Sequence, residues 1–137
     1  MGRNSERIAI LLVTLVAAVP VLAHHGFSIE FDGDSCRDMT GILTGIDWQN
    51  PHAYFHMDVK GEDGEVASWT FEMLSVPAMK RGGTERRDFL DNMGKSISVR
   101  ACLAKGSKYR AAAEMIKFSD GRPRIVGQLV ESGRLGN

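Results

Sequence analysis

The sequence predicts one mainly β domain, a barrel or small sandwich of five or six strands with one short helix. Two observations predict this all-β fold class. Several short runs alternate between apolar and polar residues, with the period of two that a half-buried strand requires. Turns rich in glycine, asparagine and aspartate separate these runs. The chain has 137 residues, which is enough for one domain and not for two.

The first 23 residues are expected to form a signal-peptide helix that precedes the β domain and is not part of its fold. Arg3 and Arg7 flank the start of an apolar run over residues 8–19, and small residues follow up to Ala23. The run is shorter than the roughly 20 residues that a membrane span needs, so we expect no stable membrane insertion. We predict cleavage after Ala23, a single domain over residues 24–137, and a periplasmic or secreted location.

The charge balance of the predicted mature chain excludes some partners. Without Arg3, Arg7 and Glu6, 15 basic and 16 acidic residues remain. This near-neutral chain has no basic patch, so we expect no nucleic-acid partner. A Gly-rich phosphate loop, a Gly-x-Ser-x-Gly turn and an HExxH helix are all missing from the sequence, so an enzyme is the least favoured class.

The first long strand is predicted over residues 39–48. Gly41 and Gly45 lie on the face opposite its apolar side chains. Glycine inside a strand often marks a bend or bulge, for example where one barrel strand curls to serve two sheets. We therefore expect this strand to be strongly bent.

The second strand is predicted over residues 52–60 and alternates strictly. Its apolar residues face the core, and its opposite face carries His52, Tyr54, His56 and Asp58. A hairpin turn over residues 61–64 leads to a third strand over residues 66–73.

The remaining elements follow in chain order. A short helix is expected over residues 75–81, with Ser75 as its cap and Pro77 in its first turn. Later strands are predicted at residues 96–104, 109–118 and 124–127. The inward apolar side chains of all the strands form the predicted core: Ile42, Ile46, Trp48, Phe55, Met57, Trp69, Phe71, Ile97, Val99 and Leu103.

Three strands, a helical crossover and two further strands form the chain order of a five-stranded OB-like barrel, with an open sandwich as the alternative. In the OB order the first strand lies antiparallel to the fourth. Cys36 precedes the first strand and Cys102 lies near the end of the fourth, so these two cysteines should meet. Neither belongs to a CxxC pair, and an exported compartment favours disulfides, so we predict a Cys36–Cys102 disulfide.

Four segments resemble a family of small exported bacterial proteins of unknown function: Ala23-His24-His25-Gly26-Phe27, Trp48-Gln49-Asn50-Pro51-His52-Ala53, Trp69-Thr70-Phe71-Glu72 and Asp120-Gly121-Arg122. Members of that family begin, after the signal peptide, with a His-His pair and carry an Asn-Pro-His turn. The resemblance implies a periplasmic, OB-like β domain and no established activity. It does not imply the disulfide or any role for His56, and residues 75–83 lack the Gly-Trp expected there.

One functional hypothesis is copper binding at the new N-terminus. Cleavage after Ala23 would let the free amine and the imidazole of His24 chelate one ion, and nitrogen donors favour copper. His52, beside the turn, is the expected third ligand, and His25 could substitute for one of them. His56 lies roughly 13 Å from His52 along a straight strand, so it cannot share the ion. The alternative is that these histidines bind no metal.

The second hypothesis is a non-metal binding module, whose partner would be a small molecule or a periplasmic protein. OB-type barrels bind ligands on the face of strands two and three. On this chain, Tyr54 and His56 would form the centre of that face. Trp48 and Trp69 lie on the apolar side of their strands, so we expect them in the core rather than in a ligand platform.

Overall fold

The computed structural model describes residues 22–130. By its internal contacts the chain divides into two units, Met1–Glu30 and Phe31–Asn137. The described part of the first unit is one helix, α2 (Leu22–Glu30), which runs on past Ala23, where the expected signal-peptide helix ends. The predicted signal segment lies almost wholly outside the described residues, so cleavage after Ala23 stays a prediction. Over residues 22–130, no helix has the length and hydrophobicity that crossing a bilayer requires.

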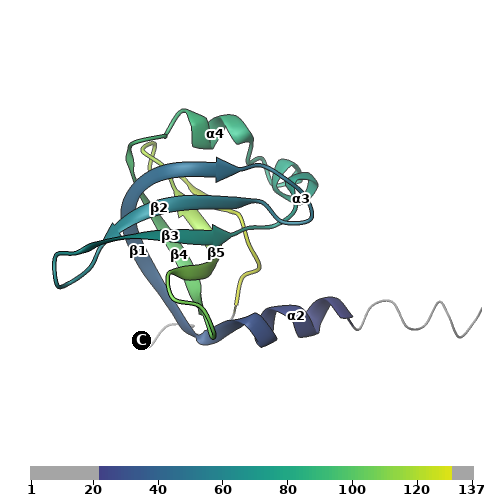
Figure 1. Ribbon diagram of the computed structural model, residues 1–137. Helices are drawn as coiled ribbons and strands as arrows, with labels where there is room; N and C mark the ends of the chain where they lie inside the picture. Colours follow the sequence, from purple (N-terminus) through teal and green to yellow (C-terminus); the bar gives the residue numbers. More distant parts are fainter. Residues whose placement is uncertain (1–21, 131–137) are drawn as a thin grey trace, which may run out of the picture. The chain divides into compact units, whose positions relative to one another are not determined.

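The second unit is a closed barrel, as predicted (Figure 1). Its strands pair in the order β3-β2-β1-β4-β5-β6, and a parallel pairing of β3 with β5 closes a ring of five, with β6 outside on β5. This is the pairing expected of an OB-like barrel. The strands are β1 (Phe31–Asp47), β2 (Tyr54–Lys60), β3 (Val66–Glu72), β4 (Ser96–Ala104), β5 (Arg110–Lys117) and β6 (Pro123–Ile125).

Strand β1 serves both sides of the barrel, as its glycines predict. Up to Ile42 it pairs with β4, and from Ile42 onwards it pairs with β2. A Cβ atom on Gly41 would lie 2.3 Å from the carbonyl oxygen of Asp58, so only glycine allows β2 to approach here. A bulge between Leu43 and Gly45 completes the bend.

The same bulge makes the prediction for Ile42 wrong. Ile42 is 42% exposed, whereas Leu43 is fully buried. Ile42 lies opposite Asp58 on the side of the sheet that faces away from the core, and Leu43 lies opposite the buried Met57. Because the bulge adds one residue, Ile46 returns to the core side, and simple alternation from Ile42 to Ile46 fails.

The rest of the predicted core is confirmed in position. Five of its residues are almost completely buried: Phe55, Met57, Phe71, Ile97 and Val99. Four are partly buried and pack against the core: Ile46, Trp48, Trp69 and Leu103. Phe55 and Phe71 stack with their ring centroids 4.7 Å apart, which ties β2 to β3.

Strand β1 begins eight residues earlier than predicted, at Phe31. Between Phe31 and Cys36, its pairing with β4 is irregular. The carboxylate of Asp32 accepts hydrogen bonds from the Ser35 hydroxyl and the Asp34 N–H, at 2.7 and 3.0 Å. These bonds, the one from Ser35 first, lower the pKa of Asp32 below its usual value. Local turn chemistry therefore did not end the strand.

Beyond that irregularity, Cys36 and Cys102 lie directly opposite each other on β1 and β4. Their Cα atoms are 3.8 Å apart and their sulfur atoms are bonded. The predicted disulfide is thus confirmed, and it links the first part of β1 covalently to β4.

Strand β5 also contains a bulge, which explains its mixed periodicity. Arg100 lies opposite Met115 but Ala101 lies opposite Ala113, so Glu114 is the extra residue. The Glu114 side chain is 2% exposed and accepts a charge-assisted bond from Nε of Arg100 at 3.1 Å.

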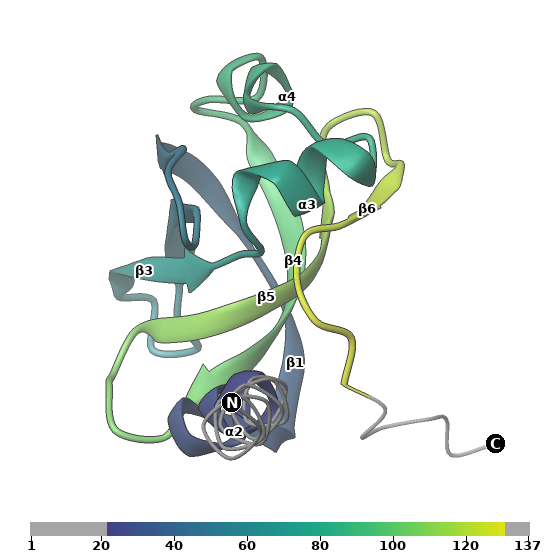
Figure 2. The ribbon, with the colours of Figure 1, turned by 90° about the vertical axis from the view of Figure 1, so that its right-hand side faces the viewer.

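Two short helices, rather than the one predicted, connect β3 to β4 at one end of the barrel (Figure 2). Helix α3 (Val76–Arg81) has Pro77 in its first turn, as expected, but the Ser75 side chain makes no capping bond. Helix α4 (Arg86–Leu90) starts with a capping box between Glu85 and Asp88. Its Phe89 is fully buried, which secures the charged segment to the core.

Candidate functional site

The outer face of β2 and β3 carries the polar side chains that the sequence placed there. Tyr54 lies opposite Glu72, His56 opposite Thr70, and Asp58 opposite Ser68. The side of these strands that carries His56 is opposite the one that carries the buried Phe55 and Phe71. We call this surface the outer face.

His52 lies just before β2, in the segment after the cis Asn50–Pro51 bond. Its Nδ1 is 3.0 Å from the carbonyl oxygen of Met73 and 3.6 Å from Oε1 of Glu72. Because a carbonyl oxygen only accepts, Nδ1 carries the proton in that bond. The side chain is half exposed, and in the neutral form of the ring this bond leaves the lone pair on Nε2.

His56 uses both ring nitrogens within the outer face. Its Nε2 is 2.9 Å from Oδ2 of Asp47, and its Nδ1 is 3.1 Å from Oγ1 of Thr70. A carboxylate, an imidazole and a hydroxyl in a row can activate a nucleophile, but acyl transfer also needs donors for the developing oxyanion. The N–H of Thr70 donates instead to the carbonyl oxygen of Tyr109 at 2.9 Å. The row therefore links β1, β2 and β3, and the Thr70 N–H is already bonded and does not act as an oxyanion donor here.

Glu72 extends this set of interactions to β5. Its Oε2 accepts a hydrogen bond from Nη2 of Arg110 at 2.7 Å, and the Arg110 guanidinium lies 5.0 Å from the ring centre of Phe31. On the outer face, His56 and Glu72 therefore already have protein partners.

The described side chains do not test the predicted copper ligands as a set. His24 and His25 lie in α2, in the other unit, and their side chains are outside the described ones. His52 lies in the barrel. The copper hypothesis for these three residues stays a prediction.

Among the described side chains, metal-ligand atoms gather at one place, where Cys36, Cys102 and Glu114 offer atoms within 4.8 Å of one another. The two sulfur atoms form the disulfide, so they are not thiolates and cannot bind an ion in that state.

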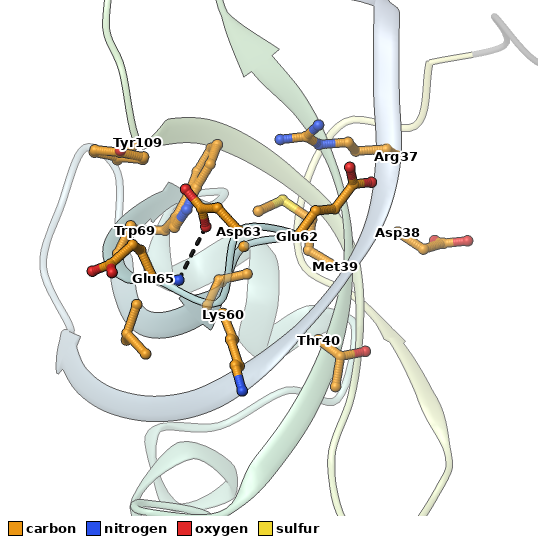
Figure 3. Close-up of a pocket in the computed structure, with 14 residues that line it drawn as sticks. Arg37, Asp38, Met39, Thr40, Lys60, Glu62, Asp63, Glu65, Trp69 and Tyr109 are labelled. Carbon is orange, nitrogen blue, oxygen red and sulfur yellow. Dashed lines mark hydrogen bonds between the residues drawn. The ribbon is translucent and has the colours of Figure 1, made fainter.

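A pocket of about 770 Å³ lies between β1 and the β2–β3 hairpin (Figure 3). It forms because the part of β1 before Ile42 pairs with β4 and leaves β2. The end of β2 then stays paired with β3 alone. Its lining comes from three parts of the chain: Arg37, Asp38, Met39 and Thr40 of β1; Val59, Lys60, Gly61, Glu62, Asp63, Glu65, Val66, Ala67 and Trp69 of the hairpin; and Tyr109.

Two aromatic rings form one side of the pocket, as Figure 3 shows. Trp69 and Tyr109 meet edge to face with their ring centroids 5.4 Å apart. The guanidinium of Arg37 lies 5.7 Å from the Trp69 ring centre, and Nζ of Lys108 lies 5.1 Å from that of Tyr109. Trp69 packs against the core as predicted, but it also lines the pocket, which sequence reasoning missed.

Acidic side chains outnumber basic ones in the lining. Four carboxylates, from Asp38, Glu62, Asp63 and Glu65, stand against two basic groups, from Arg37 and Lys60. Oδ1 of Asp63 accepts the N–H of Glu65 at 3.0 Å and so shapes the hairpin turn. Within residues 22–130, neither Glu62 nor Glu65 forms an ion pair.

A partial signal for this pocket was present in the sequence. The hairpin tip carries Glu62, Asp63 and Glu65 close to Trp69. The contributions of Arg37 and Tyr109 could not be foreseen, because they come from distant segments that only the barrel brings together. Tyr109, predicted as the first residue of a strand, also has a positive φ of 61°, which a strand residue does not adopt.

Comparison with known proteins gives a family but no activity. Nothing among the curated proteins or the solved structures matches this chain. Residues 12–112 match the model of the family of unknown function DUF6152, and because this match covers most of the chain, the protein belongs to that family.

Proposed function

We propose that this protein is an exported binding module whose ligand occupies the pocket between β1 and the β2–β3 hairpin. The observation that carries the proposal is the pocket itself, about 770 Å³, with the Trp69–Tyr109 pair on one side. Ligand sites are concave, with aromatic side chains and a few polar groups, and this lining has both. The Cys36–Cys102 disulfide supports an oxidising, exported compartment.

The pocket is a better candidate than the predicted outer face. On that face His56 is held by Asp47 and Thr70, and Glu72 is held by Arg110. A ligand there would have to replace these bonds, which offsets what it gains. A ligand in the pocket would not have to replace an ion pair at Glu62 or Glu65, since neither forms one among the described residues.

Trp69 supplies a direct test. The chain has two tryptophans, so a Trp48→Phe variant reports the environment of Trp69 alone. A panel of neutral, anionic and cationic small molecules is titrated against this protein while its fluorescence is followed. We expect at least one class to give a saturable change.

Two matched variants locate the binding. Ala67→Phe fills the pocket, whereas Ser68→Phe makes a similar change one residue later, on the outer face. Ala67→Phe should weaken binding at least tenfold and Ser68→Phe should leave it within twofold. A panel without any response, or equal losses in both variants, would contradict the proposal.

We also propose, as a second candidate, copper binding by His24, with His52 as a further ligand and His25 as its substitute. The supporting observation is that the Met73 carbonyl holds Nδ1 of His52, which orients the ring and leaves Nε2 for an ion. Copper is titrated into protein whose N-terminus is confirmed as His24 by mass. One extra residue before His24 should abolish most of the affinity, since it removes only the chelating amine.

Single variants complete the copper test. His24→Ala should cost most of the affinity, His52→Ala a smaller part, and His56→Ala little, because both His56 nitrogens are engaged elsewhere. Equal and weak copper binding by the native and the extended protein would remove this candidate.

A further inference from the structure

We infer that the pocket selects organic cations, meaning ligands that carry an ammonium or guanidinium group on a short apolar stem. This inference rests on the proposed function, because it names the ligand class of the same pocket. It is carried by the juxtaposition of two aromatic rings, Trp69 and Tyr109, with two carboxylates, Glu62 and Glu65, that have no ion-pair partner among the described residues.

The rings already attract cations within the chain. The Arg37 guanidinium lies over Trp69 at 5.7 Å, and the Lys108 ammonium lies over Tyr109 at 5.1 Å. A cation within about 6 Å of a ring centre is attracted by the negative face of the ring, and tryptophan is the strongest partner. The Trp69 ring is therefore placed to hold a cation, and in this structure the Arg37 guanidinium occupies that position.

The carboxylates give the pocket the sign that a cation requires. The lining holds four acidic and two basic residues, and although Asp38 points away from the rings (Figure 3), Glu62, Asp63 and Glu65 of the hairpin still outnumber Arg37 and Lys60. Asp38 lies 4.0 Å from Arg100 but is 81% exposed, so that pairing is weak. Within the described part of the chain, Glu62 and Glu65 pair with no basic group. A concave surface with an excess of one charge focuses its field on a ligand of the opposite charge.

The apolar stem has its own contacts. Met39, Val59 and Ala67 supply apolar side chains to the pocket lining. A neutral molecule of the same shape would bury against these residues but would gain nothing from the rings or the carboxylates. The charge on the ligand, rather than its shape, should thus dominate selection.

Arg37 then acts as an internal competitor. Its guanidinium occupies the Trp69 face that a ligand cation would use, and its charge repels that ligand. Removing it should strengthen the binding of a cation. If the pocket instead bound an anion, Arg37 would be an anchor and its removal would weaken binding. The two ligand classes therefore predict opposite signs for one substitution.

The experiment uses four probes that share a four-carbon stem: n-butylamine, n-butylguanidine, butanol and butyrate. Each is titrated against the full chain with Trp48→Phe, and the fluorescence of Trp69 is followed. The two cations should bind about tenfold more tightly than butanol, a ratio that one cation–π contact in a partly dry site supports. Butyrate should bind more weakly than butanol.

Variants test the origin of that preference. Arg37→Gln should tighten cation binding about fivefold. Lys60→Gln, which removes an equal charge away from the rings, is its matched control and should give a smaller gain. The double variant Glu62→Gln/Glu65→Gln should weaken cation binding about fivefold and leave butanol unchanged. Thermal midpoints within about 2 °C of the parent protein confirm that each variant is folded.

The outcomes separate this inference from the proposed function. If butyrate binds best and Arg37→Gln weakens it, the pocket is a ligand site for anions and the inference is overturned. If a neutral compound from the wider panel binds best and Ala67→Phe removes it, the inference again fails while the proposed function stands. If no compound responds at all, the proposed function fails with it.

Discussion

The outer face and the pocket are built largely from the same two strands, yet their polar groups differ in whether they are bonded to other side chains. Alternate residues of β3 belong to each: Thr70 and Glu72 lie on the outer face, whereas Trp69 lines the pocket. On the outer face His56 and Glu72 are bonded to other side chains. In the pocket, Glu65 has no ion-pair partner among the described residues. Polarity along a strand therefore does not identify a binding surface until the partners of each group are known.

The largest effect is expected from removing the disulfide. Its loop has a sequence separation of 66, for which the chain-entropy treatment gives about 4 kcal/mol of stability. The variant Cys36→Ala/Cys102→Ala should lose about that much free energy of unfolding in a denaturant titration. Because Arg37 follows Cys36 in the pocket wall, hydrogen exchange should speed up more at residues 36–40 than at residues 54–58. An equal increase in hydrogen exchange at residues 36–40 and 54–58 would show that the disulfide does not stabilise the pocket wall more than β2.

Glu72→Gln tests whether the outer face contributes to stability. Its carboxylate is 15% exposed and is bonded to Arg110 at 2.7 Å, so the charge-assisted bond should contribute about 1 kcal/mol. We expect that loss in the free energy of unfolding and no change beyond twofold in pocket binding. A change in ligand affinity without a change in stability would reverse the roles of the two regions.

Glu65→Gln is the matched change in the pocket. Glu65 is exposed and has no ion-pair partner in the described part of the chain, so its stability effect should stay within about 0.5 kcal/mol. Cation affinity should fall about two- to threefold in the fluorescence titration. A stability loss equal to that of Glu72→Gln would mean that this carboxylate is also structural.

The smallest effect concerns an exposed carboxylate that is paired, at the turn before β6. A side-chain hydrogen bond from Arg124, then the N–H of Arg122, lowers the pKa of Asp120 from 3.8 to about 2. Because the folded pKa is the lower one, the stabilisation is present above pH 3.8 and is lost as the pH falls towards 2. In an NMR titration, Arg124→Gln should return the Asp120 pKa towards 3.8. An unchanged pKa would show that the backbone bond alone is responsible.

Much of the fold followed from local pattern. Strand β4 has the bounds that alternation predicts, residues 96–104, and β2 and β3 differ by no more than two residues at either end. The glycines at 41 and 45 correctly indicated a bent β1. The second helix was missed because Phe89 is one of few apolar residues in a charged segment, and burial of that ring secures it.

For the candidate site, the sequence identified which residues face outward but not which of them are available. His56 was correctly placed on the outer face, but its bonds to Asp47 and Thr70 depend on the register of three strands. The pocket went unrecognised because its rings and charges come from residue 37, the hairpin and residue 109. No local period connects these positions.

By itself, the sequence predicted the mainly β fold, favoured an OB-like strand order over an open sandwich, and predicted the pairing of Cys36 with Cys102, since side-chain alternation and chain order constrain all three. Only the tertiary structure decided that Ile42 faces outward, because one bulged residue reverses the alternation. It also decided where the pocket lies. The pocket lies where β1 and the hairpin separate. This separation arises because β1 pairs with β4 up to Ile42 and with β2 from Ile42 onwards, and such long-range pairing has no local signature.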